Sequence, residues 1–198
     1  MMNKKLCFLS LFLLGLFFVS CEETKEPSKY DNWEARNDAF IDSLQQVFDA
    51  RTDPELLYVQ DSRNKSQKIF YKKIKSVAEG QSPYYTSKVS AFYRGMFINE
   101  EVFGITPKQK YYTRLYKQLD VFDGNFKSDD PSENDSPTNF AVSEVVSGWI
   151  EVLQHMKPGE RWEVYIPWRS AYGSSSNGAI PACSNLIFDI TLLEIIEP

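Results

Sequence analysis

Residues 148–167 have the sequence GWIEVLQHMKPGERWEVYIP, and this stretch decides the fold class. Its first half predicts a short helix over 148–156, because its large apolar residues fall on one stripe at helical spacing. These residues are Trp149, Val152, Leu153 and Met156. Pro158-Gly159 ends the helix. From 161 to 167 apolar and polar residues alternate, which is typical of a strand with one buried face.

The same alternation marks strands on both sides of this helix. It is clearest over 88–97 and over 185–195, and a less regular apolar run covers 70–77. A turn-forming segment, 79–83, separates the first two strands in sequence. Strands that precede and follow one short helix predict an α+β fold, in which an antiparallel β-sheet wraps around that helix.

The N-terminal segment predicts export. Lys4 and Lys5 precede a stretch of small and apolar residues from 6 to 20, which is shorter than the roughly 20 residues of a spanning helix. Residues 18–21, Phe-Val-Ser-Cys, resemble a bacterial lipobox. We therefore expect 1–20 to be a lipoprotein signal peptide and Cys21 to carry the lipid that anchors the chain to a membrane of the bacterial cell envelope, facing the periplasm or the surface. A spanning anchor or a buried N-terminal helix is the alternative.

Between the leader and the sheet the sequence predicts a tether and a helix. Residues 21–29 are charged and contain Pro27, which is typical of a flexible tether. A helical N-terminal extension is expected over 30–65, with its helix over 30–50, because four large apolar residues lie on one helical face. They are Trp33, Phe40, Leu44 and Val47. Residues 51–54, Arg-Thr-Asp-Pro, are expected to end this helix.

Charge and histidine content exclude several kinds of site. Without Lys4 and Lys5 the 22 basic residues fall to 20, against 27 acidic residues. An acidic chain of this kind is not expected to bind nucleic acid through its surface field. With His155 as its only histidine, the chain is not expected to hold a histidine-based metal site. We expect a monomer without a metal or a cofactor.

The C-terminal half resembles a known family. Val-Val-x-Gly-Trp at 145–149, Lys-Pro-Gly at 157–159, Ala-Tyr-Gly at 171–173, Ile-Pro at 180–181 and Phe-Asp at 188–189 follow one another as in FKBP-type peptidyl-prolyl cis-trans isomerases. The resemblance implies an FKBP-like isomerase domain over 66–198. It also implies proline-containing polypeptides as the substrate class.

Carried over by position, the resemblance implies a pocket built mainly from apolar side chains. Trp149 corresponds to its floor, and the backbone N–H of Val146 corresponds to a donor to a substrate carbonyl. The hydroxyl of Tyr172 corresponds to a second donor. The remaining expected lining residues are Tyr93, Phe140, Val145, Ile180 and Phe188.

The Phe-Asp pair of the family has two possible positions here. Direct counting from the strand at 88–97 reaches Phe103-Gly104, which lacks the acid. Allowing an insertion near 99–119 reaches Phe122-Asp123, which keeps both residue types and is preferred. Around Ile180-Pro181 the flap departs from the family pattern, because Ala179 and Ala182 flank the pair.

Prolyl isomerisation uses no nucleophile and no metal, so the chain's lack of an obvious catalytic acid or base is no objection. The expected activity is isomerisation of X-Pro bonds during the folding of exported proteins. The alternatives are a non-catalytic envelope lipoprotein that binds proline-containing chains or acts as a chaperone, and a structural lipoprotein.

Overall fold

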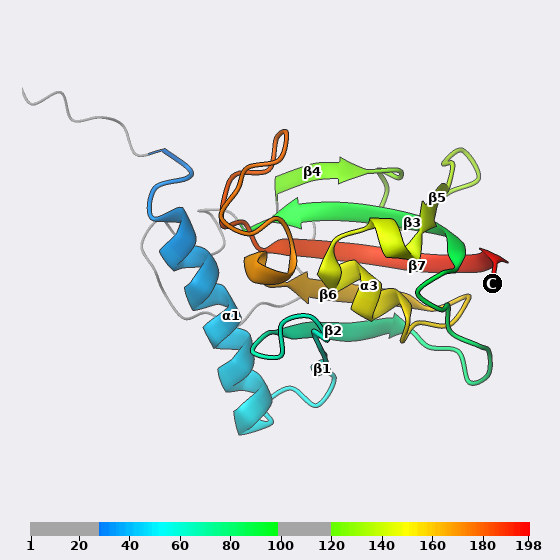
Figure 1. The fold of residues 1–198 in the computed structure, drawn as a ribbon, viewed down its shortest axis with the longest axis horizontal. Helices are drawn as coiled ribbons and strands as arrows, with labels where there is room; N and C mark the ends of the chain where they lie inside the picture. Colours follow the sequence, from blue (N-terminus) through cyan, green and yellow to red (C-terminus); the bar gives the residue numbers. More distant parts are fainter. Residues whose placement is uncertain (1–27, 99–119) are drawn as a thin grey trace, which may run out of the picture.

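The computed structural model describes residues 28–98 and 120–198, and within them an antiparallel sheet carries the fold. The strands are β1 (Leu57–Gln60), β2 (Lys68–Lys75), β3 (Lys88–Phe97), β4 (Asp120–Gly124), β5 (Thr138–Ala141), β6 (Arg161–Ile166) and β7 (Leu186–Glu197). Their order is β1-β2-β6-β7-β3-β4, and β5 also pairs with β3 (Figure 1). Every pair is antiparallel.

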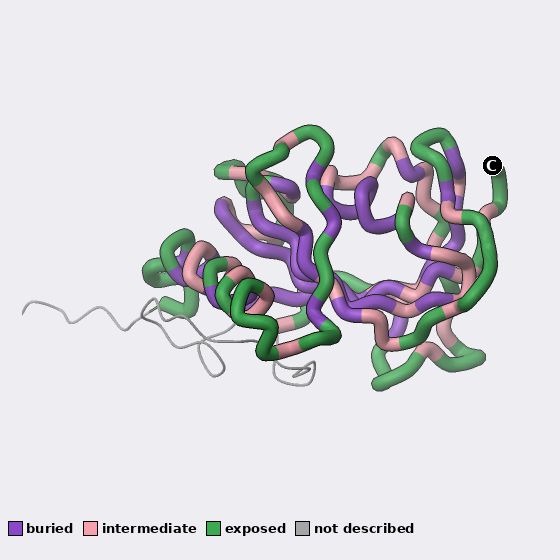
Figure 2. The backbone as a smooth tube through the Cα atoms, turned by 90° about the horizontal axis from the view of Figure 1, so that it is seen from below, coloured by how far each residue is buried: buried purple, intermediate pink, exposed green. Residues whose placement is uncertain are grey.

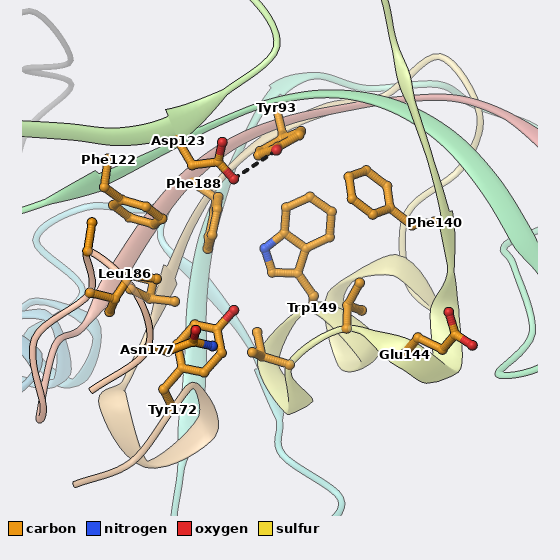
Figure 3. A pocket seen from close by; sticks show the side chains of 14 residues that line it. Tyr93, Phe122, Asp123, Phe140, Glu144, Trp149, Tyr172, Asn177, Leu186 and Phe188 are labelled. Atoms are coloured by element: carbon orange, nitrogen blue, oxygen red, sulfur yellow. Dashed lines mark hydrogen bonds between the residues drawn. The ribbon is translucent and has the colours of Figure 1, made fainter. Parts of the chain in front are cut away.

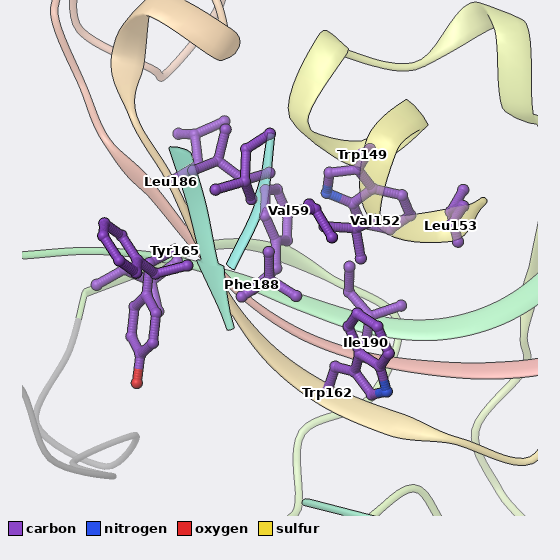
Figure 4. Close-up of a cluster of buried hydrophobic side chains, with 14 of the residues drawn as sticks. Val59, Trp149, Val152, Leu153, Trp162, Tyr165, Leu186, Phe188 and Ile190 are labelled. Atoms are coloured by element: carbon purple, nitrogen blue, oxygen red, sulfur yellow. The ribbon is translucent and has the colours of Figure 1, made fainter. Parts of the chain in front are cut away.

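The short helix α3 (Ser147–Leu153) lies across one face of this sheet (Figure 1). Its apolar side chains pack against strand residues such as Trp162 and Ile190 (Figure 4). The helix approaches the sheet closely at Gly148, where an added methyl carbon would lie only 2.4 Å from Ile166 Cγ2. Burying each large apolar side chain contributes about 1.5–3 kcal/mol. The predicted α+β fold, with an antiparallel sheet around one short helix, is confirmed.

The longer helix α1 (Trp33–Ala50) covers the opposite face. Phe40 packs edge-on against Tyr165, with ring centroids 6.0 Å apart, whereas the next strand residue, Ile166, meets α3. Successive strand residues point to opposite faces of a sheet. Trp33, Phe40 and Leu44 are buried, as their shared helical face predicts, and the strands are mostly buried while the outer loops are exposed (Figure 2).

The helix predicted over 30–50 is present in the N-terminal extension. It forms α1 (Trp33–Ala50), and Arg51 ends it in the left-handed conformation with a φ of 52°. Leu57–Gln60 instead forms β1, an edge strand that pairs with β2 and buries Val59. A four-residue strand is too short to show a period in the sequence, and its pairing comes from the sheet. The extension is thus partly built into the same sheet.

Two segments of the sequence interpretation lie outside the described residues. The first is the leader together with the start of the tether, which includes Cys21. The second is the expected insertion near 99–119.

Two short helical turns connect the elements around the site. They are η2 (Val142–Glu144) and η3 (Trp168–Ser170). Over residues 28–98 and 120–198, no helix has the length and apolar character needed to span a membrane.

Candidate functional site

A pocket of about 650 Å³ opens between α3, the strands β3, β4 and β7, and the loop that follows η3 (Figure 3). All ten residues predicted from the sequence line it: Tyr93, Phe122, Asp123, Phe140, Val145, Val146, Trp149, Tyr172, Ile180 and Phe188. They are drawn from seven separate segments between 93 and 188. The sequence shows the order of these residues along the chain, and the fold brings their side chains together in space.

Trp149 lies at the centre of the lining rings. It is buried, and three rings meet it edge-to-face: Tyr93, Phe140 and Phe188, with centroid separations of 5.7, 5.2 and 5.1 Å. Edge-to-face pairs of this kind add about 0.5–1.5 kcal/mol each beyond their buried area. The indole is therefore held rigidly, with aromatic walls around it (Figure 3).

One wall carries a polar pair. The Tyr93 hydroxyl donates a hydrogen bond of 2.8 Å to Asp123 Oδ2, and Asp123 Oδ1 accepts one from the Gly124 N–H. Burial, followed by the hydrogen bond to Asp123, raises the pKa of Tyr93 to about 12. At neutral pH Tyr93 is therefore a neutral phenol, and its hydroxyl proton is used in the hydrogen bond to Asp123.

The preferred Phe-Asp pair lies at this wall. Phe122 stacks on Phe97 with centroids 4.4 Å apart and meets Phe188 edge-on at 5.8 Å. The alternative pair, Phe103-Gly104, lies outside the described residues. Phe122 and Asp123 both line the pocket, and the choice between the two pairs stays a prediction.

The opposite wall is the loop between η3 and β7. Tyr172 is 38% exposed, and its ring borders the cavity (Figure 3). Asn177 and Ile180 exchange two backbone hydrogen bonds of 2.9 Å around a turn in which Gly178 has a φ of +56°. At the base of the loop the Cys183 N–H donates to the Gly173 carbonyl at 2.9 Å. The flap around Ile180-Pro181 is thus a closed, hydrogen-bonded loop.

The first turn of α3 offers a backbone donor. Val146 caps the helix, and its carbonyl accepts hydrogen bonds from the N–H groups of Trp149 and Ile150. Its own N–H donates no hydrogen bond to any of the described residues. The first N–H groups of a helix lack partners within the helix, so they are free to meet a ligand.

Sequence reasoning missed several residues around the pocket. Glu144, Asn177, Ala179 and Leu186 also line it. Leu186 lies two residues before Phe188 in the same strand, a spacing that puts both side chains on one face. For Leu186, this alternation was the signal available in the sequence.

Gly95 is a second omission, because it carries no side chain to notice. A methyl carbon added there would lie 2.6 Å from Phe122 Cζ and 2.7 Å from Phe188 Cε1. Glycine is therefore required for the two rings to occupy the wall together.

The pocket has the chemistry of a binding site for an uncharged, largely apolar group. Among its lining residues two are acidic, Asp123 and Glu144, and none is basic. No group of three or more His, Cys, Asp or Glu that could hold a metal ion occurs in 28–98 or 120–198. The arrangement can enclose a small ring and present hydrogen-bond donors at its edge.

Comparison with known proteins shows what the C-terminal part of the chain is similar to. Residues 104–193 match the family model of the FKBP-type peptidyl-prolyl cis-trans isomerases. The chain is 40% identical over 86 residues to the macrophage infectivity potentiator of Trypanosoma cruzi, covering 43% of this chain and 41% of that protein. It is 31% identical over 124 residues to the peptidyl-prolyl cis-trans isomerase Mip of Coxiella burnetii, covering 62% and 43%.

The chain matches less than half the length of both of these curated relatives. A solved structure gives independent support for the fold. The crystal structure of FkpA from Escherichia coli superposes with a TM-score of 0.52 at 21% identity, covering 84% of this chain and 64% of that one.

Proposed function

We propose that this chain isomerises X-Pro peptide bonds in polypeptide clients, because residues 104–193 match the family model of the FKBP-type peptidyl-prolyl cis-trans isomerases. The observation that carries the proposal is the pocket, where the ten side chains expected from that family line one cavity around Trp149. The cavity accommodates a proline ring and the amide that precedes it.

The pocket suits this reaction because rotation of an amide needs no covalent catalyst. Its barrier of about 18–20 kcal/mol arises from the loss of resonance at the twisted transition state. A twisted amide has less charge separation than a planar one, so a water-poor aromatic cavity favours it over the ground state. Each tenfold acceleration requires only about 1.4 kcal/mol of such preference.

The two proposed donors, the Tyr172 hydroxyl and the Val146 N–H, differ from the Tyr93 hydroxyl in being free, within the described part of the chain, to bind a substrate. The Tyr93 hydroxyl is already bonded to Asp123, whereas the Tyr172 hydroxyl is at the open side of the pocket. We assign the substrate carbonyls to the Tyr172 hydroxyl and to the Val146 N–H. Trp149 then supports the proline ring, and Tyr93 with Asp123 forms a polar edge of the wall.

We also propose that the chain acts outside the cytoplasm, in the bacterial cell envelope, tethered to a membrane through lipid on Cys21. The support is the leader, in which Lys4 and Lys5 precede an apolar stretch that ends at Cys21. Metabolic labelling with a radioactive fatty acid tests this part. We expect label on the wild-type chain and none on Cys21→Ala, and equal labelling of both would refute it.

An isomerisation assay tests the activity. The full chain, solubilised in detergent, is mixed with a short X-Pro peptide, and cis-trans exchange is followed by NMR. We expect acceleration that is lost in the double variant Tyr172→Phe with Phe188→Ala. Tyr84→Phe is the matched control, because Tyr84 is an exposed tyrosine outside the pocket.

No acceleration by the folded wild-type chain at high concentration would refute the proposed activity. Peptide-induced shifts of pocket resonances without faster exchange would then identify the chain as a non-catalytic binding module.

A further inference from the structure

Asp61 is a buried carboxylate that lies outside the pocket and directly follows β1. It accepts four hydrogen bonds. Two come from side chains, Ser170 Oγ at 2.6 Å and Ser147 Oγ at 3.0 Å. Two come from the backbone N–H groups of Arg63 at 2.9 Å and Asn64 at 3.1 Å.

These bonds keep the carboxylate charged. Burial alone would raise its pKa, but the hydrogen bonds from Ser170, Arg63, Ser147 and Asn64 outweigh burial, so the pKa of Asp61 lies below its ordinary value. At neutral pH, Asp61 is therefore an anion that holds all four donors. Hydrogen bonds to charged groups stabilise by about 1.5–3 kcal/mol, more than those between neutral groups.

The two serines belong to opposite sides of the pocket. Ser147 is the first residue of α3 and follows Val146, whose N–H is the proposed backbone donor. Ser170 ends η3, two residues before Tyr172, whose hydroxyl is the proposed side-chain donor. One carboxylate from the N-terminal extension thus connects the two segments that carry the donors.

The N-terminal extension also binds both ends of the loop that carries Tyr172, residues 168–185. At its start, the Trp168 Nε1–H donates to Asp38 Oδ1 on α1 at 2.8 Å. At its end, the buried Asn185 N–H donates to Asn37 Oδ1 at 2.8 Å, and its side-chain amide donates to the Asn37 carbonyl. The loop is therefore fixed to residues that precede the segment matched by the family model, 104–193.

On this basis, and given the proposed isomerase activity, we propose that Asp61 is a positioning residue for the reaction. By holding Ser147 and Ser170 together, it sets the separation of the Val146 N–H and the Tyr172 hydroxyl. Asp61 does not touch the substrate and acts through these two donors. A displacement of about 1 Å in a group that orients the substrate can cost about 100-fold in rate, so a small change in this separation has a large effect.

Replacement of the carboxylate and of each serine tests the proposal. We expect Asp61→Asn to lower kcat/KM for an X-Pro peptide about tenfold. Ser147→Ala and Ser170→Ala should each lower it severalfold, and Ser147→Thr, which keeps the hydroxyl, should restore most of the rate. The double variant of Ser147→Ala with Ser170→Ala should cost less than the sum of the two, because both act through one carboxylate.

The matched control is Asp135→Asn, which removes a carboxylate that accepts bonds from Ser132 Oγ and the Ser132 N–H in an exposed loop. It should leave kcat/KM unchanged. All rates are measured on the full chain in detergent, well below each variant's melting temperature, so that every variant is almost wholly folded. A loss of stability alone cannot then lower the rate, whereas a loss of donor geometry does.

The outcomes separate this inference from the proposed function. An inactive, folded wild-type chain would refute the isomerase activity and this inference with it. An active wild type whose Asp61→Asn and serine variants keep the wild-type kcat/KM would overturn the inference alone. If Asp61→Asn does not fold, the serine variants decide. A loss of rate in Asp61→Asn without any loss in the serine variants would also overturn it, because the connection through the serines would be absent.

Discussion

Replacement of Gly95 by alanine is the most informative single perturbation of the pocket. Gly95 lies in β3, opposite Asp123 of β4 and Phe188 of β7. The new methyl carbon would lie 2.6 and 2.9 Å from Phe122 Cζ and Cε2 and 2.7 Å from Phe188 Cε1. Carbon atoms pack at about 3.5–4.0 Å, so both rings must move by about 1 Å.

We expect the rings to give way toward the cavity. Phe188 is buried against Trp149, while Phe122 is half-buried at the pocket wall, so the displacement is directed into the cavity. Overpacking of this kind costs about 1–3 kcal/mol. Alanine in place of a strand glycine recovers up to about 1 kcal/mol of backbone entropy. We expect a net loss of about 1–2 kcal/mol in the free energy of unfolding.

Activity should fall as well as stability. The displaced rings occupy space that the substrate needs, so kcat/KM for an X-Pro peptide should drop at least tenfold, which corresponds to about 1.4 kcal/mol. Urea unfolding and the NMR exchange assay measure the two effects. Adding Phe122→Leu to Gly95→Ala should restore stability beyond the sum of the single changes, because leucine lacks the clashing ring atoms. A Gly95→Ala variant with wild-type stability and rate would refute the reasoning.

Three further predictions concern the wall, the floor and the loop. In a spectrophotometric titration Tyr93 should ionise near pH 12; its contribution to stability is complete below pH 10, its ordinary pKa, and is lost as pH rises through 12. Asp123→Asn should lower that pKa only in part, because burial is the larger cause, and a return to 10 would contradict this. Trp149→Ala should lower the free energy of unfolding by about 3–5 kcal/mol in urea, and a loss below 1 kcal/mol would contradict its central position. Asn37→Ala should cost about 1–3 kcal/mol, because it leaves the buried Asn185 N–H unpaired, and should speed amide hydrogen exchange at 171–185; unchanged exchange would argue against the attachment of the loop to α1.

Strong local periods made part of the fold predictable. The strand over 88–97 and the short helix near 148–156 have large apolar residues at regular spacing, and both appear close to their expected bounds. β1 has four residues and no period of its own, so no pattern in the sequence indicated that this part of the extension would join the sheet. Its strand character depends on pairing with β2.

In the candidate site, too, some residues were predictable from the sequence and others were not. Aromatic residues such as Trp149 and Tyr172 were identifiable because their types occur in a family order, and all ten predicted residues line the pocket. Gly95 and Asp61 were not identifiable. The importance of Gly95 depends on the distance to two rings, and that of Asp61 on two serines that lie 86 and 109 residues away in sequence.

The sequence alone therefore determined which elements form, which faces they bury and which family the C-terminal half resembles, because these depend on residue types at short, regular spacing. The tertiary structure alone decided how wide the pocket is, how the two proposed donors are placed and how α1 and Asp61 of the N-terminal extension contact the segments around the site. Those properties are distances between segments far apart in the chain. They are set by packing and hydrogen bonds that exist only once the sheet has closed around α3.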